Sequence, residues 1–489
     1  MVFSELIFVY GFLPLNLIIY FLAKNVRVKN TVLLLFSLAF YAWGEPTYVL
    51  LLVAMAFIDW LLSLWVGVAR ARGRMWSARI ALILACIVSL GGIGVFKYGT
   101  FFMENLQLFT GYPSVVPQIL LPIGISFYTF QLLSYVIDVY RGEVPPQRKF
   151  HLLLLYVSLF HQCIAGPIVR YQDVSEELLR RTTSFKEMAE GITRFTVGFA
   201  KKALLANQCD LLAKQFLGLK GEDTLEALTL TQMTSLPAVA LWASMACYML
   251  MIYLDFSAYS DMAIGMGKMI GFHYKENFNY PYISQTVTDF WRRWHMSLSS
   301  FFRDYVYIPL GGNRCGKVRQ LFNMLVVWAL TGLWHGASWN FVLWGLYFFV
   351  FLAFEKLFFG IVLDFLPRVF RHIYLLAVVF FGWILFRVED LSQMWAIVCG
   401  LFGANGNVLT NFETNTLLLG NSIFLGVAIL ACTPLVKTVS QAMADKAQTS
   451  KVMFVVNGIV QIVAPVVLLF LGTAMLIGNS YNPFLYFRF

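Results

Sequence analysis

Long apolar stretches recur along the chain and are separated by short polar or basic loops. A helix of about 20 apolar residues crosses the ~30 Å hydrocarbon core of a bilayer, because each residue adds about 1.5 Å. The pattern therefore predicts an all-α, polytopic transmembrane helical bundle of about eleven spans. The clearest spans are residues 5–23, 31–43, 47–68, 80–96, 119–140, 236–254, two within 321–359, 372–387, 417–436 and 454–478.

Some stretches depart from simple spans. Residues 97–118 are amphipathic and are predicted to lie along the membrane interface. Residues 119–140 contain Pro122 and Gly124 near their start, which predicts a broken start. Residues 151–169 end at Gly166-Pro167, so we expect a re-entrant segment there, which is tolerated only inside protein or in a wet cavity. We expect one polytopic domain over 1–489, with its motif core at 119–359 and C-terminal spans at 372–489.

Composition supports a membrane protein. The chain is 59% hydrophobic and 13% charged, whereas soluble domains carry about 25% charged residues. The formal net charge of +10 indicates Lys and Arg in cytoplasmic loops beside anionic lipid. No basic soluble domain with interleaved aromatic residues is evident, so nucleic acid is not an expected partner. The seven cysteines form no C-x-x-C pair, which argues against structural disulfides, a zinc cage or any metal site. No bound cofactor is expected.

One window stands apart from the rest of the chain. Between Arg319 and Glu355 there is no Lys, Arg, Asp or Glu, and His335 is the one group there that titrates near neutral pH. A titratable side chain deep in an apolar span is costly and usually marks a substrate path or reaction centre. The alternative is a histidine that only holds neighbouring helices together. Glycines 332 and 336 flank His335 and predict a break between two helices, and Trp334, Trp339 and Asn340 are candidate lining residues.

A second informative region is the predicted short helix 287–306. On a single helix His295 would share a face with Trp291, Leu298 and Phe302 and would point inward. Arginines on other faces could bind the phosphates of an acyl donor such as coenzyme A; they are Arg292, Arg293, Arg303 and Arg314. The alternative is an interfacial helix with snorkelling arginines.

The apolar stretch 253–272 also contains two aspartates, Asp255 and Asp261. Carboxylates at that depth are candidate substrate-binding or proton-relay groups. With His335 they would form a proton relay if the chain were a transporter.

Several stretches resemble the membrane-bound O-acyltransferase (MBOAT) family, in its bacterial alginate O-acetyltransferase branch. The matching residues are YLDFSAYSDMAIGMGKMIGF (253–272), ENFNYPYIS (276–284), FWRRWHMSLSSFFRDYVYIPLGGNR (290–314) and TGLWHGASWNFVLWG (331–345). The resemblance implies a ring of tilted helices around a central pore, His335 as catalytic residue and His295 as a second histidine near the cytoplasmic mouth. It also implies the bacterial plasma (inner) membrane, a cytoplasmic thioester donor such as acetyl-coenzyme A, an extracytoplasmic SGNH-type partner and an exported polysaccharide acceptor such as alginate.

Acyl transfer to a hydroxyl needs a base, a stabilised oxyanion and exclusion of water. Burial favours a neutral histidine, so His335 is predicted to accept the hydroxyl proton. Direct transfer is favoured over an acyl-enzyme, because no nucleophilic Cys or Ser motif is evident. The rival functions are a lipid acyltransferase, a teichoic-acid D-alanyl transferase and a transporter or flippase without chemistry.

Overall fold

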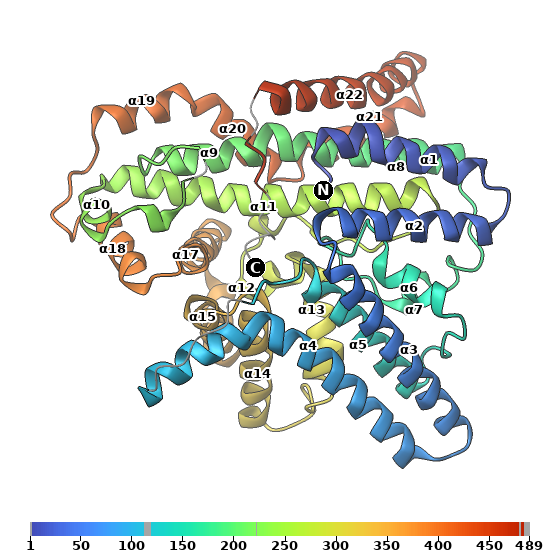
Figure 1. The fold of residues 1–489 in the computed structure, drawn as a ribbon. Helices are drawn as coiled ribbons and strands as arrows, with labels where there is room; N and C mark the ends of the chain where they lie inside the picture. Colours follow the sequence, from blue (N-terminus) through green and yellow to red (C-terminus); the bar gives the residue numbers. More distant parts are fainter. Residues whose placement is uncertain (1, 112–118, 222, 479–480, 484–489) are drawn as a thin grey trace. The chain divides into compact units, whose positions relative to one another are not determined.

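The computed structural model describes residues 2–111, 119–221, 223–478 and 481–483, and it contains helices and no β-strand over these ranges (Figure 1). The predicted all-α class is therefore confirmed for this part of the chain. The chain divides into two compact units. One runs to Phe195 and resumes over Ser260–Glu276, and the other comprises Thr196–Tyr259 and the residues from Asn277 onward.

The helices of the first unit are α1 to α7, with a π-helical turn η1 before α1. They are η1 Phe8–Phe12, α1 Leu13–Leu22, α2 Val26–Gly44, α3 Tyr48–Ala71, α4 Met75–Thr110, α5 Ile125–Arg141, α6 Phe150–Ser158 and α7 Tyr171–Val174. Two helices continue from one unit into the other, α8 Phe185–Ala200 and α11 Ala238–Met269.

The remaining elements belong to the second unit. They are η2 Lys201–Ala206, α9 Asn207–Gln215, η3 Leu225–Ala227, α10 Leu230–Ser235, η4 Pro281–Ile283, α12 Val287–Arg293, α13 Met296–Phe302, η5 Arg303–Tyr307, α14 Lys317–His335, α15 Trp339–Phe354, η6 Glu355–Phe359, α16 Gly360–Phe365, α17 Arg368–Arg387, α18 Leu391–Leu401, α19 Phe412–Gly420, α20 Ser422–Ala431, α21 Leu435–Ala447 and α22 Lys451–Gly478.

Six helices of the described residues are long and apolar enough to cross a membrane, or seven if the bent pair α19 and α20 counts as one span. The six are Tyr48–Ala71, Met75–Thr110, Ala238–Met269, Trp339–Phe365, Arg368–Arg387 and Lys451–Gly478. The multi-pass prediction is confirmed. The larger count of about eleven and the ring around a pore stay predictions.

Helix α4 corrects one expectation. Residues 80–96 and 97–110 form one continuous helix of 36 residues beginning at Met75, about 54 Å long, and not a span followed by an interfacial segment. Residues 112–118 of the expected interfacial segment lie outside the described ranges. Lys97, at the start of the expected interfacial segment, is buried, and its Nζ donates to Ser126 Oγ over 3.4 Å. With that partner, the lysine does not force the helix to the surface.

Within the first unit α3, α4 and α5 pack against one another. The Ser63 and Tyr135 hydroxyls lie 3.1 Å apart, and Ser89 donates to Asp59 Oδ2 over 2.8 Å. Helix α5 begins directly after Gly124, whose φ of +76° is a conformation that glycine adopts easily. The predicted broken start at this position is confirmed.

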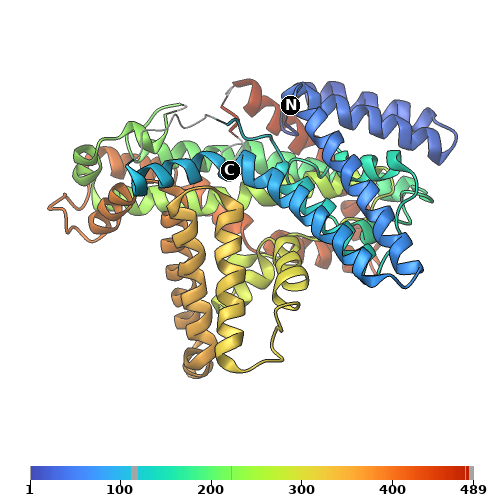
Figure 2. The same ribbon diagram turned by 60° about the horizontal axis from the view of Figure 1, so that its bottom comes forward.

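In the second unit α14 and α15 run side by side, as the neighbouring gold helices of Figure 2 show. The short α12 and α13 also pack together, and α12 contacts α15 and α17. A buried ion pair joins Lys202 Nζ and Asp255 Oδ1 at 2.6 Å. Of the two histidines of the candidate site, His335 ends α14, and His295 lies at the break between α12 and α13.

Candidate functional site

His335 is the last residue of α14, and the chain breaks there before α15 begins at Trp339. The two helices touch through glycines. A Cβ added at Gly332 would lie 2.3 Å from the Phe341 carbonyl oxygen, and one added at Gly345 would lie 2.3 Å from the Trp328 carbonyl oxygen. Larger residues cannot occupy these positions without separating the helices. The predicted helix break beside His335 is confirmed.

Aromatic rings enclose the His335 imidazole. Its ring centroid lies 4.9 Å from that of Trp334, 5.0 Å from Trp344 and 5.2 Å from Phe386, all with steeply inclined planes. The side chain is buried, with 6% of its surface exposed. The ring is therefore largely shielded from solvent by aromatic side chains, apart from the cavity that it lines.

Asn340 anchors the neighbouring helix. Its Nδ2 donates to the carbonyl oxygens of Leu385 and Phe386, each over 3.3 Å. Its Oδ1 accepts a hydrogen bond from Ser338 Oγ. Asn340 therefore fixes the end of α17 beside His335 and is not among the residues that line the cavity.

His295 does not continue a helix as expected. The predicted single helix 287–306 breaks at this residue, since α12 ends at Arg293 and α13 begins at Met296. His295 has φ +43° and ψ +56°, the left-handed region that residues other than glycine rarely adopt. The prediction of one continuous helical face is therefore wrong, although His295 does point inward and is 1% exposed. Burial lowers the pKa of His295 to about 3, so its ring is neutral at physiological pH.

Asn277 holds the turn at His295 through hydrogen bonds. Its backbone oxygen accepts a hydrogen bond from Met296 N–H over 2.9 Å. Its Oδ1 accepts from the Ser297 N–H over 3.2 Å and from Ser297 Oγ over 2.9 Å, and lies 3.1 Å from His295 Nδ1. Asn277 was part of a matching motif but had no role in the sequence-based predictions.

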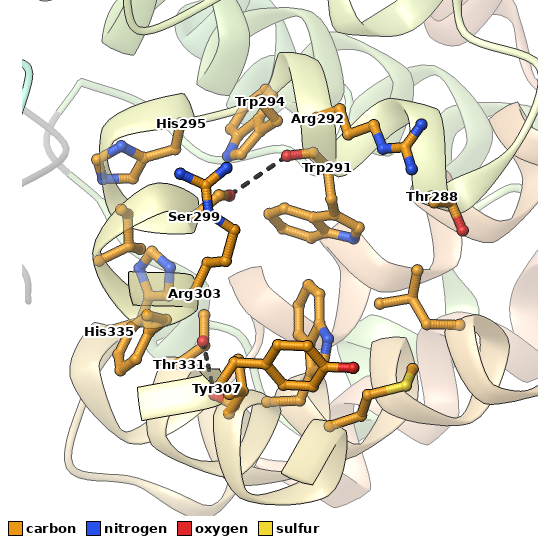
Figure 3. Close-up of a pocket in the computed structure, with 16 residues that line it drawn as sticks. Thr288, Trp291, Arg292, Trp294, His295, Ser299, Arg303, Tyr307, Thr331 and His335 are labelled. Carbon is orange, nitrogen blue, oxygen red and sulfur yellow. Dashed lines mark hydrogen bonds between the residues drawn. The ribbon is translucent and has the colours of Figure 1, made fainter. Parts of the chain in front are cut away.

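A cavity of about 240 Å³ brings the two histidines together (Figure 3). Trp334 contacts both, with its ring centroid 5.7 Å from that of His295 and 4.9 Å from that of His335. The cavity is lined by Thr288, Trp291, Arg292, Trp294, His295, Leu298, Ser299, Phe302, Arg303, Tyr307, Met324, Val327, Trp328, Thr331, His335 and Leu352. Four of the predicted site residues are therefore collected around one space: His295, His335, Arg292 and Arg303.

The arginines differ in their surroundings. In Figure 3 Arg303 extends toward His295 and Ser299, and Arg292 lies beside Thr288 at the other end of the cavity. Arg303 is exposed and pairs with Asp304 over 2.7 Å. Arg293 does not line the cavity, because it pairs with Asp289 one turn earlier on α12.

Two further candidates lie elsewhere. Trp339 is 52% exposed and does not line the cavity. Asp261 belongs to the first unit, where its Oδ1 lies 3.0 Å from Arg194 Nη2. Arg194 also pairs with Glu276 at 2.5 Å. Asp261 is therefore part of an ion-pair cluster and not of this cavity.

Glu355 is a site component that the sequence patterns did not identify. Its carboxylate is buried and accepts hydrogen bonds from Val287 N–H over 2.6 Å, Thr288 N–H over 2.9 Å and Thr288 Oγ1 over 2.6 Å. It thus caps the first turn of α12, where a negative charge is favourable. The only sequence signal was its position as the first charged residue after the charge-free window.

In the described ranges no group of three or more His, Cys, Asp or Glu side chains could hold a metal ion. The side chains that could take part in a reaction or bind a ligand are instead two histidines, the indole N–H groups and two arginines around one cavity. This set can accept a proton, bind an anion and exclude water.

Comparisons with known proteins show which family the chain resembles. The family model described as MBOAT, membrane-bound O-acyltransferase family, matches residues 149–394, which include both histidines. The chain is 37% identical over 519 residues to the probable alginate O-acetylase AlgI of Azotobacter vinelandii, with 100% of each chain covered. It is 38% identical to the probable alginate O-acetylase AlgI of Pseudomonas aeruginosa, over 86% of this chain and 80% of the relative. It is 30% identical to the peptidoglycan O-acetyltransferase of Helicobacter pylori, over 83% and 80%.

Proposed function

Because this chain belongs to the membrane-bound O-acyltransferase family, we propose that it moves an acetyl group from a cytoplasmic thioester donor to hydroxyl groups of an exported polysaccharide. The observation that carries the proposal is the shared cavity of His295 and His335. The chain is an acyltransferase by its family, and the two histidines give that chemistry a place.

The proposed acceptor is a polysaccharide such as alginate. Relatives named as alginate O-acetylases match over the whole chain or most of it, and one relative is named for acetylation of peptidoglycan, also a glycan polymer. A lipid acceptor and a D-alanyl donor remain the rival acyl-transfer hypotheses, and a transporter is the rival without chemistry. The products of an assay with acetyl-coenzyme A distinguish these hypotheses. A lipid acyltransferase would form acetylated lipid, and a D-alanyl transferase or a transporter would not consume acetyl-coenzyme A.

The proposed donor is acetyl-coenzyme A. Pockets for drug-sized ligands usually measure about 300–1,000 Å³, so a cavity of about 240 Å³ suits the thioester end of the donor and not the whole coenzyme. Arg292 and Arg303 line the cavity and are also exposed to solvent, so their guanidinium groups suit donor phosphates that remain outside the cavity. Because Arg293 does not line the cavity, it is not assigned to the donor.

In the proposed reaction the acceptor hydroxyl oxygen attacks the thioester carbonyl carbon. His335 takes the hydroxyl proton, the carbon–sulfur bond breaks, and the proton goes finally to the departing thiolate. No covalent enzyme intermediate is invoked. The apolar rings around His335 keep water from competing with the acceptor. His295 serves as the second proton carrier.

We place the enzyme in the bacterial inner membrane as a single multi-pass domain with about eleven spans around a pore. A cavity open to both sides would let a cytoplasmic donor meet an external acceptor at His335. An extracytoplasmic SGNH-type acyltransferase is the proposed partner that passes the acetyl group to the polymer. The basic loops near the spans favour contact with anionic lipid on the cytoplasmic face.

His335→Ala tests the proposal. Purified full-length protein in lipid nanodiscs is assayed for thiol release from acetyl-coenzyme A in the presence of the SGNH-type partner and polysaccharide fragments as acceptor. General base catalysis contributes about 10²–10⁴-fold, so we expect a loss of turnover in that range. His151→Ala is the matched control, because His151 is exposed on α6.

Two results would overturn the proposal. If folded His335→Ala protein kept the wild-type rate, His335 would not be the base. If wild-type protein consumed no acetyl-coenzyme A but moved a substrate across the bilayer, the transporter hypothesis would replace it. Acetylated lipid as the product would favour the lipid acyltransferase.

A further inference from the structure

The turn at His295, between α12 and α13, combines three features: a positive φ, almost complete burial and a place in the cavity lining. His295 and Tyr280 are the two residues other than glycine with positive φ in the described ranges. Such strain persists only where the surrounding structure holds it, and it concentrates at functional sites. The same residue is almost fully buried and lines the cavity that also contains His335. The contacts that hold it therefore bear on its chemistry.

Asn277 supplies those contacts from outside the helices. Its backbone oxygen and side-chain oxygen together accept three hydrogen bonds from Met296 and Ser297, the two residues after His295. The Asn277 side chain is itself 1% exposed. The two segments are also joined by the Asn279 N–H, which donates to the Arg293 carbonyl oxygen over 2.9 Å.

The hydrogen bonds determine which ring nitrogen of His295 carries the proton. A backbone N–H can only donate, so the Asn277 atom facing the Ser297 N–H must be the amide oxygen. The same oxygen faces His295 Nδ1 at 3.1 Å. Nδ1 must therefore be the donor, and in a neutral ring the lone pair then lies on Nε2. Nε2 is buried and has no hydrogen-bond partner among the described protein atoms.

We propose that Asn277 is a positioning residue that holds His295 in the Nδ1–H tautomer, so that Nε2 is the proton-accepting atom of the second histidine. The inference rests on the proposed function for its catalytic consequence. In the reaction, the acceptor proton passes from His335 to His295 Nε2 and then to the thiolate sulfur. Asn277 Oδ1 stays an acceptor throughout, so the transient imidazolium keeps a hydrogen-bond partner on Nδ1. The ring is neutral before and after each turnover.

The charged and titratable neighbours of this ring are few. His335, Arg303 and Arg292 line the same cavity. Phe256 packs edge-on against the ring with centroids 4.7 Å apart, and the preceding Asp255 is paired with Lys202. A carboxylate in place of the Asn277 amide would therefore be the only negative group placed directly on Nδ1–H among the described residues, and it would favour the charged ring.

Nitrogen NMR on full-length protein with ¹⁵N-histidine tests the inference without depending on activity. The chain has six histidines, and His295→Gln identifies the relevant signals. We expect a protonated Nδ1 and a bare Nε2 in the wild type. Asn277→Asp should retain that tautomer and shift the midpoint of His295 ring protonation to higher pH. The acidic limb of the pH profile of kcat should move in the same direction. Asn279→Ala is the matched control, because Asn279 is exposed and its backbone N–H and C=O make the hydrogen bonds to Arg293.

Asn277→Ala should mix the two tautomers and lower kcat for acetyl-coenzyme A turnover by about 10- to 100-fold, the range seen when a histidine loses its orienting partner. The KM for acetyl-coenzyme A should change by less than about twofold, because the donor-binding arginines are untouched. If this variant does not fold, Asn277→Asp alone decides, since it keeps an oxygen at the same position. A wild-type ring protonated on Nε2, or an unchanged pH midpoint in folded Asn277→Asp protein, would overturn the inference. If the wild type showed the expected tautomer but consumed no acetyl-coenzyme A, the proposed function would fail while the assignment of Asn277 stood.

Discussion

The capping of α12 by Glu355 gives a sharp test of what holds the part of α12 that lines the cavity. The carboxylate comes from η6, at the end of α15, and reaches the first turn of a helix that lies 67 residues earlier in the chain. That helix carries Trp291 and Arg292, which line the cavity. Glu355→Ala removes all three hydrogen bonds, and Glu355→Gln keeps one acceptor oxygen and the side-chain shape.

The expected loss follows from these contacts. Hydrogen bonds to charged groups contribute about 1.5–3 kcal/mol each, and a buried N–H left without a partner costs about 1–3 kcal/mol. Val287 is fully buried, so water cannot easily replace the lost acceptor there. Because such terms overlap and do not add, we expect the free energy of unfolding to fall by about 3–5 kcal/mol for Glu355→Ala. Glu355→Gln should lose about half as much.

Thermal unfolding in detergent and the KM for acetyl-coenzyme A measure the two consequences. The midpoint should fall in the order wild type, Glu355→Gln, Glu355→Ala, and KM should rise in the same order because α12 is less well fixed. Glu413→Ala is the matched control, since it changes an exposed glutamate and surface substitutions stay within about 0.5 kcal/mol. Equal midpoints for Glu355→Ala and the control would refute the capping argument.

Two further predictions concern charge. Arg303→Gln should raise the KM for acetyl-coenzyme A by about tenfold with little change in kcat, because it removes binding that is equal in the ground and transition states; an unchanged KM in steady-state assays would remove Arg303 from the donor site. In the first unit a hydrogen bond to Glu177 raises the pKa of His273, with Glu187 as the next partner. The stabilisation of the folded state by protonated His273 is then fully present below the pKa of an unfolded histidine, about 6.5, and is lost as pH rises through the folded pKa. His273→Ala should therefore lower the thermal unfolding midpoint at pH ~6 and change it little at pH ~9. A gap that widens with rising pH would contradict this sign.

The helical class and the His335 hairpin could be predicted because their signals are local. A charge-free apolar window with glycines at its middle specifies two close helices and a break, and the structure has that form. Helix α4 was predicted less well, because the change to an amphipathic pattern after residue 96 is not a helix end. The buried Lys97 has Ser126 as a partner 29 residues away, and a pairing at that distance leaves no periodic trace in the sequence.

The second histidine shows the same limit at the site. Periodicity placed His295 on the inner side, which its burial confirms, but it could not show the break between α12 and α13. No glycine or proline marks position 295. The left-handed turn is held by Asn277, 18 residues earlier, and Glu355 fixes the start of α12 from even farther away. Side chains distant in sequence, and not local propensity, decide the geometry of α12, α13 and the turn between them.

The glycine contacts between α14 and α15 also determine how the enzyme could be altered to accept larger acyl groups. At Gly332 and Gly345 the two backbones already touch, so no substitution there can enlarge the neighbouring space. Room for a longer chain must come from side chains on the cavity wall that can be shortened, such as Leu298, Val327 and Leu352. Under the proposed function, the spacing of the two backbones is therefore fixed at the glycines, and acyl selectivity would be changed through the side chains that line the cavity, from α13 as well as from α14 and α15.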